Sequence, residues 1–244
     1  MMTTTKNKVL DLGHVEYVSH MGNDLTVANA ARVSFNQESE WDIDQEVKQR
    51  LTASGSSYHE SDLRVVSEKD KKLINYLAKH NHWTPFSHPQ ITLRIKAPIF
   101  VRTQLFKHKV GFTENEISRR YVKYAPEFYV PKWRYAPTGN AKQGSGDFIE
   151  NTEHLEILYT LTALDAVNAY NKLLEQGVAP EQARGILPQG TYTEWWWTGS
   201  LSAYARVFKQ RIDTHAQWEV QQYAAAIGQI IEPLFPVCWK HLTI

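Results

Sequence analysis

The stretch QITLRIKAPIFVRTQLFKHK, residues 90–109, contains two patterns that decide how this part of the chain folds. Apolar side chains at every second position from Ile91 to Ile95 predict a half-buried β-strand over Gln90–Lys96. Pro98 suits the first turn of a helix, because that position needs no backbone N–H donor. We therefore expect the strand to be followed directly by a helix over Ile99–Lys109.

The rest of the chain contains more helical than strand-like patterns. A further strand is expected over Val9–Ser19. The stretches 36–67 and 129–147 are polar or rich in Pro and Gly, and we expect them to be surface excursions. Together the patterns indicate an α+β protein. Helical spacing of apolar residues or helix-start signals recur over 25–32, 68–79, 157–174, 179–186, 202–213 and 220–231.

The composition excludes several classes of protein. The chain has 244 residues, of which 42% are hydrophobic, so it can bury a substantial core. A formal net charge of +1 is small for a protein whose main partner is duplex nucleic acid. The sequence has no apolar run long enough to span a bilayer and no apolar signal core in Met1–Lys8. A cytoplasmic protein is therefore expected.

The single cysteine, Cys238, lies in the apolar sequence FPVCW. This setting predicts a small buried residue. A nucleophilic thiol needs a neighbouring base or cation that lowers its pKa. Lys240 and His241 are near in the sequence, so a nucleophilic role is disfavoured but stays open.

The segment Gln104–Tyr121 carries the densest set of functional groups in the chain. On a helix, Gln104, Lys107 and His108 share one face, where an amide, a cation and an imidazole suit a phosphorylated or carbonyl-rich ligand. The following residues, 110–121, add two carboxylates and two guanidinium groups in a stretch expected to be non-helical. A solvated charged loop is the alternative, but the apolar side chains between the charges favour a partly buried site.

This segment resembles the signature of the flavin-dependent thymidylate synthases, which reads Arg-His-Arg, then seven or eight residues, then Ser and commonly Arg-Tyr. Here Lys107-His108-Lys109 is followed, after eight residues, by Ser118-Arg119-Arg120-Tyr121. Other stretches match the same family in the same order, which makes the resemblance specific. They are Ala30–Phe35, Asn81–His88, Ala183–Pro188 and Arg211–Glu219.

The resemblance implies one catalytic domain over residues 1–244, with a mainly antiparallel or mixed sheet packed against several helices. It implies reductive methylation of dUMP to dTMP, with methylenetetrahydrofolate as carbon donor and NADPH as reductant through FAD. It also implies a homotetramer with shared active sites, whose other partners are small molecules rather than nucleic acid or membrane. No metal is expected, because His82 and His88 lack the spacing of zinc ligands.

The resemblance further implies roles for individual residues. Arg211 is expected to contact the uracil ring, and because an arginine stays protonated, its role is to stabilise a developing anion. Without the resemblance, a salt bridge of Arg211 with Asp213 or Glu219 is the simpler interpretation. The implied dUMP contacts are Gln104, Lys107, Glu116, Ser118, Arg120, Arg184 and Arg211. The implied FAD contacts are Ser34, His82, Thr84, Lys107, His108, Lys109, Asn115, Glu116, Ser200, Arg206 and His215.

Two alternatives stay open. Lysines at 107 and 109 keep the charge of the family's arginines but lose their planar fork, and the region of Ser200 and Arg206 also departs from the family. These departures suggest a catalytically impaired homologue that still binds nucleotide or flavin. The second alternative is a single-stranded nucleic-acid-binding module, supported by cations interleaved with aromatic residues. Those cations are Arg94, Lys96, Arg102, Lys107, Lys109, Arg119, Arg120 and Lys123.

Overall fold

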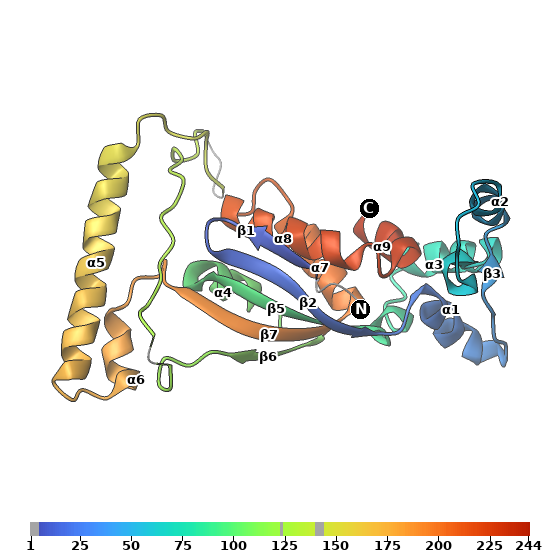
Figure 1. Ribbon diagram of the computed structural model, residues 1–244, viewed down its shortest axis with the longest axis horizontal. Helices are drawn as coiled ribbons and strands as arrows, with labels where there is room; N and C mark the ends of the chain where they lie inside the picture. Colours follow the sequence, from blue (N-terminus) through green and yellow to red (C-terminus); the bar gives the residue numbers. More distant parts are fainter. Residues whose placement is uncertain (1–4, 123, 140–143) are drawn as a thin grey trace.

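The computed structural model describes residues 5–122, 124–139 and 144–244, so Lys123 lies outside the described residues. Its centre is a five-stranded antiparallel sheet in the order β1-β2-β5-β7-β6 (Figure 1). This arrangement confirms the expected α+β fold. The strands are β1 (Lys6–Val9), β2 (Gly13–Met21), β5 (Gln90–Pro98), β6 (Phe112–Glu116) and β7 (Tyr192–Ser200).

The helices form a layer on the sheet and two extensions at its ends (Figure 1). Helices α7 (Leu201–Arg211) and α8 (Trp218–Ile231) pack on the sheet together with α4 (Ile99–Leu105). Helix α5 (Glu153–Glu175) stands away from the body as an arm. Within the described residues, no helix is long and apolar enough to cross a bilayer. The remaining helices are α1 (Asp24–Arg32), α2 (Gln45–Ala53), α3 (Glu68–Lys79), α6 (Pro180–Ala183) and α9 (Pro236–Thr243).

The core lies between one face of the sheet and helices α7 and α8. Alternate side chains of β5 and β7 point to this face, because successive residues of a strand point to opposite sides. Trp195 and Trp197 are at most 1% exposed there. Tyr204 from α7 packs edge-on against Trp197 and donates its hydroxyl to the Trp197 carbonyl at 2.6 Å. Large aromatic surfaces buried in this way stabilise the contact between sheet and helices.

The helix expected over Ile99–Lys109 is wrong at its C-terminal end. Helix α4 ends at Leu105, so Lys107 and His108 lie in a turn, and the shared helical face expected for them does not form. The chain must reverse here, because Phe112 stacks on Trp197 with ring centroids 4.1 Å apart. Gly111 permits the reversal through a φ of +84°, a conformation that glycine adopts readily.

Two strands also differ from expectation. The strand expected over Val9–Ser19 is wrong at its start, since the chain turns at residues 10–12 and makes the hairpin of β1 and β2. No element was expected for β7. Its three consecutive tryptophans hide the alternation, because Trp196 points away from the core and is 52% exposed.

The two expected surface excursions have different structures. Residues 36–67 contain α2, a 3-10 helix η2 (Glu60–Leu63) and a small ribbon of β3 (Asp42–Ile43) with β4 (Arg64–Val65). The described part of 129–147 forms no named strand or helix, although Arg134 makes an isolated bridge with Phe148.

Cys238 is buried, as its apolar surroundings predict. Burial raises the pKa of its thiol, and the nearby Asp24 carboxylate adds to the increase. Asp24 accepts hydrogen bonds from the backbone N–H groups of Val237 and Cys238, each at 2.9 Å, at the start of α9. A thiol in this setting is a structural residue and a poor nucleophile.

A buried ion pair connects α1 to α3. The Arg32 guanidinium donates from Nε to Asp70 Oδ1 at 2.8 Å, and Ser39 and Ser67 also donate to this carboxylate. Asp70 is 1% exposed and Arg32 is 9% exposed. The pair therefore fixes the start of the 3-10 helix η1 (Val33–Phe35), which follows Arg32 directly.

Replacing Asp70 by Asn is expected to destabilise the protein by about 3–5 kcal/mol, because it leaves a buried guanidinium without its counter-charge. Glu68→Gln on the same helix is the matched control. It breaks the exposed pair with Lys71 and is expected to change the stability only slightly. Denaturant unfolding of both variants tests this, and equal losses would contradict it.

Candidate functional site

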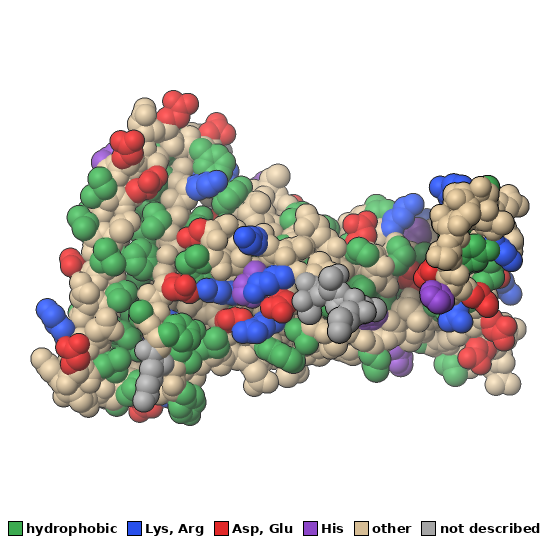
Figure 2. Space-filling model, viewed as in Figure 1, with side chains coloured by type: hydrophobic (Ala, Val, Ile, Leu, Met, Phe, Trp, Pro, Cys, Tyr) green, Lys and Arg blue, Asp and Glu red, His purple; other side chains and the backbone are tan. Residues whose placement is uncertain are grey.

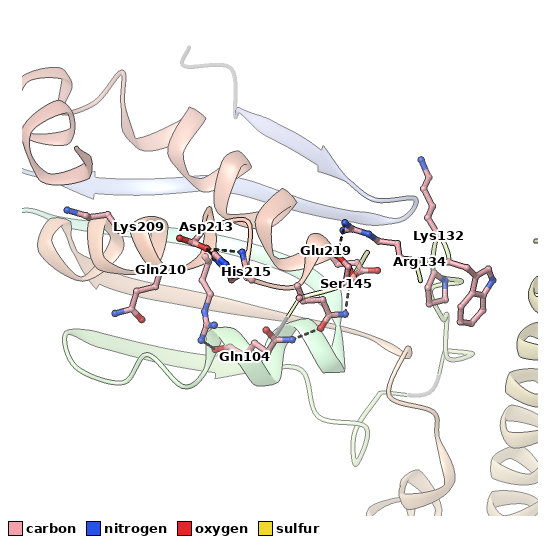
Figure 3. A pocket seen from close by; sticks show the side chains of 15 residues that line it. Gln104, Lys132, Arg134, Ser145, Lys209, Gln210, Asp213, His215 and Glu219 are labelled. Atoms are coloured by element: carbon pink, nitrogen blue, oxygen red, sulfur yellow. Dashed lines mark hydrogen bonds and ion pairs between the residues drawn. The ribbon is translucent and has the colours of Figure 1, made fainter. Parts of the chain in front are cut away.

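A cavity of about 920 Å³, named here the α4–α7 pocket, opens between α4, the C-terminal end of α7 and the start of α8 (Figure 3). Residues 131–134 and 144–145 of the irregular segment form another wall. Lys132, Arg134 and Arg211 bring positive charge to the pocket, and Asp213 and Glu219 bring negative charge. A concave site with several convergent polar groups is suited to a small ligand.

Arg211, the last residue of α7, is fixed by two hydrogen bonds. Its Nε donates to His108 Nε2 at 3.0 Å, and its Nη2 donates to the Gln104 carbonyl at 3.2 Å. The salt bridge considered for Arg211 with Asp213 or Glu219 is absent from the part of the chain that the structure describes. Neither carboxylate therefore neutralises the positive charge of Arg211, which lines the pocket.

The carboxylates near Arg211 have other partners. Asp213 accepts from the backbone N–H of His215 and pairs with its Nδ1, both at 2.8 Å. Glu219 is 6% exposed and accepts from Gln217 Nε2 at 2.9 Å. Gln217 in turn accepts from Gln104 Nε2 at 2.5 Å, so a chain of amides links α4 to the start of α8. These contacts hold both carboxylates away from the arginine.

His108 is buried beside two cations. Burial, followed by the charges of Arg211 and Arg206, lowers the pKa of His108 from 6.5 to about 4. The imidazole is therefore neutral at neutral pH, in agreement with its Nε2 accepting from Arg211. The other ring nitrogen, Nδ1, must then carry the proton.

A second cavity, named here the α1–α3 pocket, has a volume of about 840 Å³. It is lined by the predicted FAD residues Ser34, His82 and Thr84, which come from η1 and from the segment before the 3-10 helix η3 (Pro85–Ser87). Tyr76 and Trp83 supply aromatic walls. The structure thus brings Ser34 together with His82 and Thr84, which lie 48 and 50 positions later in the sequence.

A smaller cavity of about 520 Å³ is lined by His82 together with Arg206. Arg206 donates from Nη2 to the Val110 carbonyl, which ties α7 to the turn before β6. Ser200 is 4% exposed, and its hydroxyl caps α7 by accepting from Ala203 N at 3.2 Å. Its side chain therefore has a local structural role.

The predicted residues on β6 lie on different faces of the sheet. Glu116 accepts from Arg102 Nε at 2.9 Å and from Thr193 Oγ1 at 2.7 Å, on the face that bears the helices. Asn115 is exposed and points to the opposite face, as strand alternation requires. Lys109 forms an ion pair with Glu114. Within one chain, β6 therefore does not present these residues to a single ligand.

The remaining predicted residues lie at the surface. Lys107 is exposed in the turn after α4. Ser118 Oγ accepts from Arg120 N and Nε, both at 3.3 Å, and Arg120 is exposed. Arg184 is exposed in the 3-10 helix η4 (Arg184–Ile186), which packs against α5. These positions are separate from the α4–α7 pocket, whereas Gln104, Arg211 and His215 line it.

Sequence reasoning missed several residues of the α4–α7 pocket. Gln217 and Glu219 lie in a stretch that matches the family, but no role was assigned to them. Lys132 and Arg134 belong to a segment interpreted as a surface excursion. Arg134 donates from Nε to the Gly146 carbonyl at 2.9 Å, a contact with no periodic signal in the sequence. Only the tertiary structure brings these residues to the pocket.

Four of the eight cations considered for nucleic-acid binding are paired with carboxylates. Figure 2 shows basic and acidic side chains intermixed over the middle of the molecule. Paired cations contribute less to the binding of a phosphate backbone than free ones. No group of three His, Cys, Asp or Glu residues among those described could hold a metal ion. The ion pairs are Arg94–Glu194, Lys96–Glu127, Arg102–Glu116 and Lys109–Glu114.

Comparison with known proteins identifies the family of this chain. Residues 16–237 match the family described as Thymidylate synthase complementing protein. The chain is 37% identical to the flavin-dependent thymidylate synthase of Thermotoga neapolitana over 231 residues, 95% of this chain and 91% of that protein. It is 36% identical to the enzyme of the same name from Thermus thermophilus, over 95% of this chain and 76% of that one.

A solved structure shows the same fold. The UMP/dUMP methylase PolB from Streptomyces cacaoi, bound with 5-Br dUMP, superposes with a TM-score of 0.77 at 26% identity and covers 97% of each chain. The fold is therefore that of an α+β enzyme of the class to which PolB belongs. The chain belongs to the Thymidylate synthase complementing protein family, whose relatives include the flavin-dependent thymidylate synthases.

The depressed pKa of His108 predicts a specific loss of stability in acid. Between pH 6.5 and about 4 the unfolded state binds a proton at His108 that the folded state does not. The His108 contribution is therefore fully present above pH 6.5 and is lost as the pH falls toward 4. A shift of this size corresponds to about 3 kcal/mol.

The measurement is the free energy of unfolding of the wild type and of His108→Gln at several pH values. Glutamine can accept a hydrogen bond from Arg211 but does not titrate. The stability of the His108→Gln variant should therefore fall less than that of the wild type between pH 6.5 and about 4. Other titrating groups act on both proteins equally. Parallel curves for the two proteins would show that His108 is not responsible.

Proposed function

We propose that the protein is a flavin-dependent thymidylate synthase, which methylates dUMP to dTMP with methylenetetrahydrofolate as carbon donor and NADPH as reductant through FAD. The observation that carries this proposal is the position of Arg211. Its guanidinium is held by His108 and Gln104, and its positive charge lines the α4–α7 pocket. Relatives that are 36–37% identical over about 95% of the chain bear the name of this enzyme.

The α4–α7 pocket suits a pyrimidine nucleotide monophosphate. Lys132 and Arg134 offer positive charge for a phosphate. The Arg211 guanidinium, placed against the uracil ring, would favour loss of the ring N–H proton by stabilising the resulting anion. The anionic ring is the better nucleophile toward the one-carbon unit, so the reaction needs no cysteine. This agrees with the burial of Cys238.

The α1–α3 pocket fits part of a flavin dinucleotide. Its volume of about 840 Å³ and its aromatic walls, Tyr76 and Trp83, suit a planar ring system. Ser34, Thr84 and His82 offer hydrogen bonds to polar groups of such a ligand. FAD bound there and reduced by NADPH would supply the hydride needed to reduce the transferred carbon to a methyl group. Lys107, Lys109 and Asn115 would complete the site only from another part of the assembly.

Self-association as a homotetramer would bring the separate groups together. The two pockets and Arg184 lie on different elements of one chain. Figure 2 shows apolar side chains along the projecting helix α5. Ile157, Leu158 and Leu161 are between 59% and 66% exposed there. Exposed apolar side chains grouped on one face of a helix are typical of an interface between subunits.

A catalytically impaired homologue is the second candidate. Its supporting observations are that Lys109 is paired with Glu114 and that Ser200 is a buried helix cap. Lys109 and Ser200 are both expected FAD contacts, and at both positions the residue differs from the one usual in the family. An impaired homologue would bind dUMP or FAD without forming dTMP, so binding and turnover must be measured separately.

Purified protein is expected to show flavin absorbance bands, or to acquire them after incubation with FAD. The physical reason is the aromatic α1–α3 pocket with its hydroxyl and imidazole groups. Riboflavin, which lacks the adenine nucleotide, serves as the control ligand and should bind more weakly. Absence of any flavin uptake would refute the cofactor assignment.

Arg211→Ala is expected to reduce formation of dTMP by at least about 100-fold, because it removes the charge that stabilises the uracil anion. The assay contains dUMP, methylenetetrahydrofolate, NADPH and FAD. Arg50→Ala, an exposed arginine on the distant helix α2, is the matched control and should retain normal activity. Normal turnover by Arg211→Ala, with the oligomer intact, would exclude the assigned role.

Leu161→Glu is expected to reduce the oligomeric mass in solution, because it places a charge in the apolar surface of α5. Thr162→Glu adds the same charge about 100° away around the helix and should have the smaller effect. Sedimentation velocity distinguishes the species. An unchanged mass for Leu161→Glu would place the subunit interface elsewhere.

A further inference from the structure

We infer that His108 is the positioning residue of Arg211: its Nε2 holds the guanidinium in one orientation without neutralising it. The inference rests on the proposed function and adds a distinct role for a residue otherwise expected only to contact FAD.

The contacts of Arg211 define the plane of its guanidinium. Nε donates to His108 Nε2 at 3.0 Å and Nη2 donates to the Gln104 carbonyl at 3.2 Å. Because the guanidinium is planar, two hydrogen bonds on one edge fix the whole group. The other terminal nitrogen is then directed by the same two bonds. The turn after α4 supplies one acceptor and the last turn of α4 supplies the other.

The partners of Arg211 are both neutral. A carboxylate at the position of His108 would also orient the guanidinium, but it would cancel much of the positive charge available to a ligand. A neutral imidazole and a backbone carbonyl orient the group and leave its charge intact. Burial and the nearby Arg206 favour the neutral state of His108. This combination suits a residue that must stabilise a developing anion.

The tautomer leaves His108 with a donor, Nδ1–H, for a second contact. Since Nε2 accepts from Arg211, the proton lies on Nδ1, which can donate to another group. His108 occupies the middle of the Lys107–Lys109 segment that is expected to contact FAD. One ring would thus contact the cofactor through Nδ1 and position Arg211 through Nε2.

The test compares His108→Gln with His108→Asn. The glutamine amide reaches the position of Nε2 and can accept from Arg211, whereas the shorter asparagine amide reaches only the position of Nδ1. We expect Asn to lower kcat for dTMP formation about 100-fold, with the KM for dUMP changed by less than about threefold. Gln keeps the acceptor at the position of Nε2 but loses the Nδ1 donor, so its kcat should fall below that of the wild type and remain at least about tenfold above that of Asn. Flavin absorbance of each variant reports separately on cofactor binding.

A second measurement does not depend on activity. An arginine-selective dicarbonyl such as phenylglyoxal, followed by peptide mass spectrometry, reports how freely Arg211 moves. Modification of Arg211 should be several-fold faster in His108→Asn than in the wild type or in His108→Gln. Melting temperatures of both variants establish that they are folded.

The outcomes separate this inference from the proposed function. Equal turnover of the Asn and Gln variants, or equal modification of Arg211 in all three proteins, would overturn the positioning role. Rescue by Asn and not by Gln would assign His108 to cofactor contact through Nδ1 alone. A wild type that forms no dTMP would refute the proposed function, and the modification rates would still decide whether His108 holds Arg211.

Discussion

The pairing of β5 with β7 is the constraint on which the rest of the structure depends. Its register runs without interruption from Gln90 opposite Ser200 to Pro98 opposite Tyr192. Each strand continues directly into a helix, α4 after Pro98 and α7 after Ser200. Because the strands are antiparallel, the two helices begin at opposite ends of the pair. Helix α7 runs back across the sheet, and its last residue, Arg211, therefore meets the end of α4.

The positively charged side chains of the molecule have two kinds of partner, carboxylates and neutral groups. At the edge of the sheet, cations such as Lys109 and Arg102 lie beside carboxylates, so their charges are largely compensated. Arg211 instead contacts an imidazole and a carbonyl, while Asp213 and Glu219 are held by other groups. The structure thus separates positive charge that stabilises the fold from positive charge that is available to a ligand.

Local sequence patterns predicted elements whose residues alternate or repeat regularly, and failed where tertiary contacts decide the outcome. The alternation over Gln90–Lys96 gave β5 correctly, because every second side chain enters the core. Strand β7 has no such signal, since Trp196 is as apolar as its buried neighbours. The early end of α4 goes with a reversal of the chain that lets Phe112 stack on a distant ring, a contact that no local window contains. The bond between His108 and Arg211 joins residues 103 positions apart and is equally invisible to periodicity.

The arm formed by α5 lies in the long connection between β6 and β7, two strands that are neighbours in the sheet. In the folding chain this connection is a loop whose ends must meet before the strands pair. The entropy cost of closing a loop grows only with the logarithm of its length, so doubling the loop would cost about 0.6 kcal/mol. The connection between β6 and β7 can therefore change in length during evolution at little cost to the stability of the sheet. Such changes would alter how far α5 extends from the body of the protein.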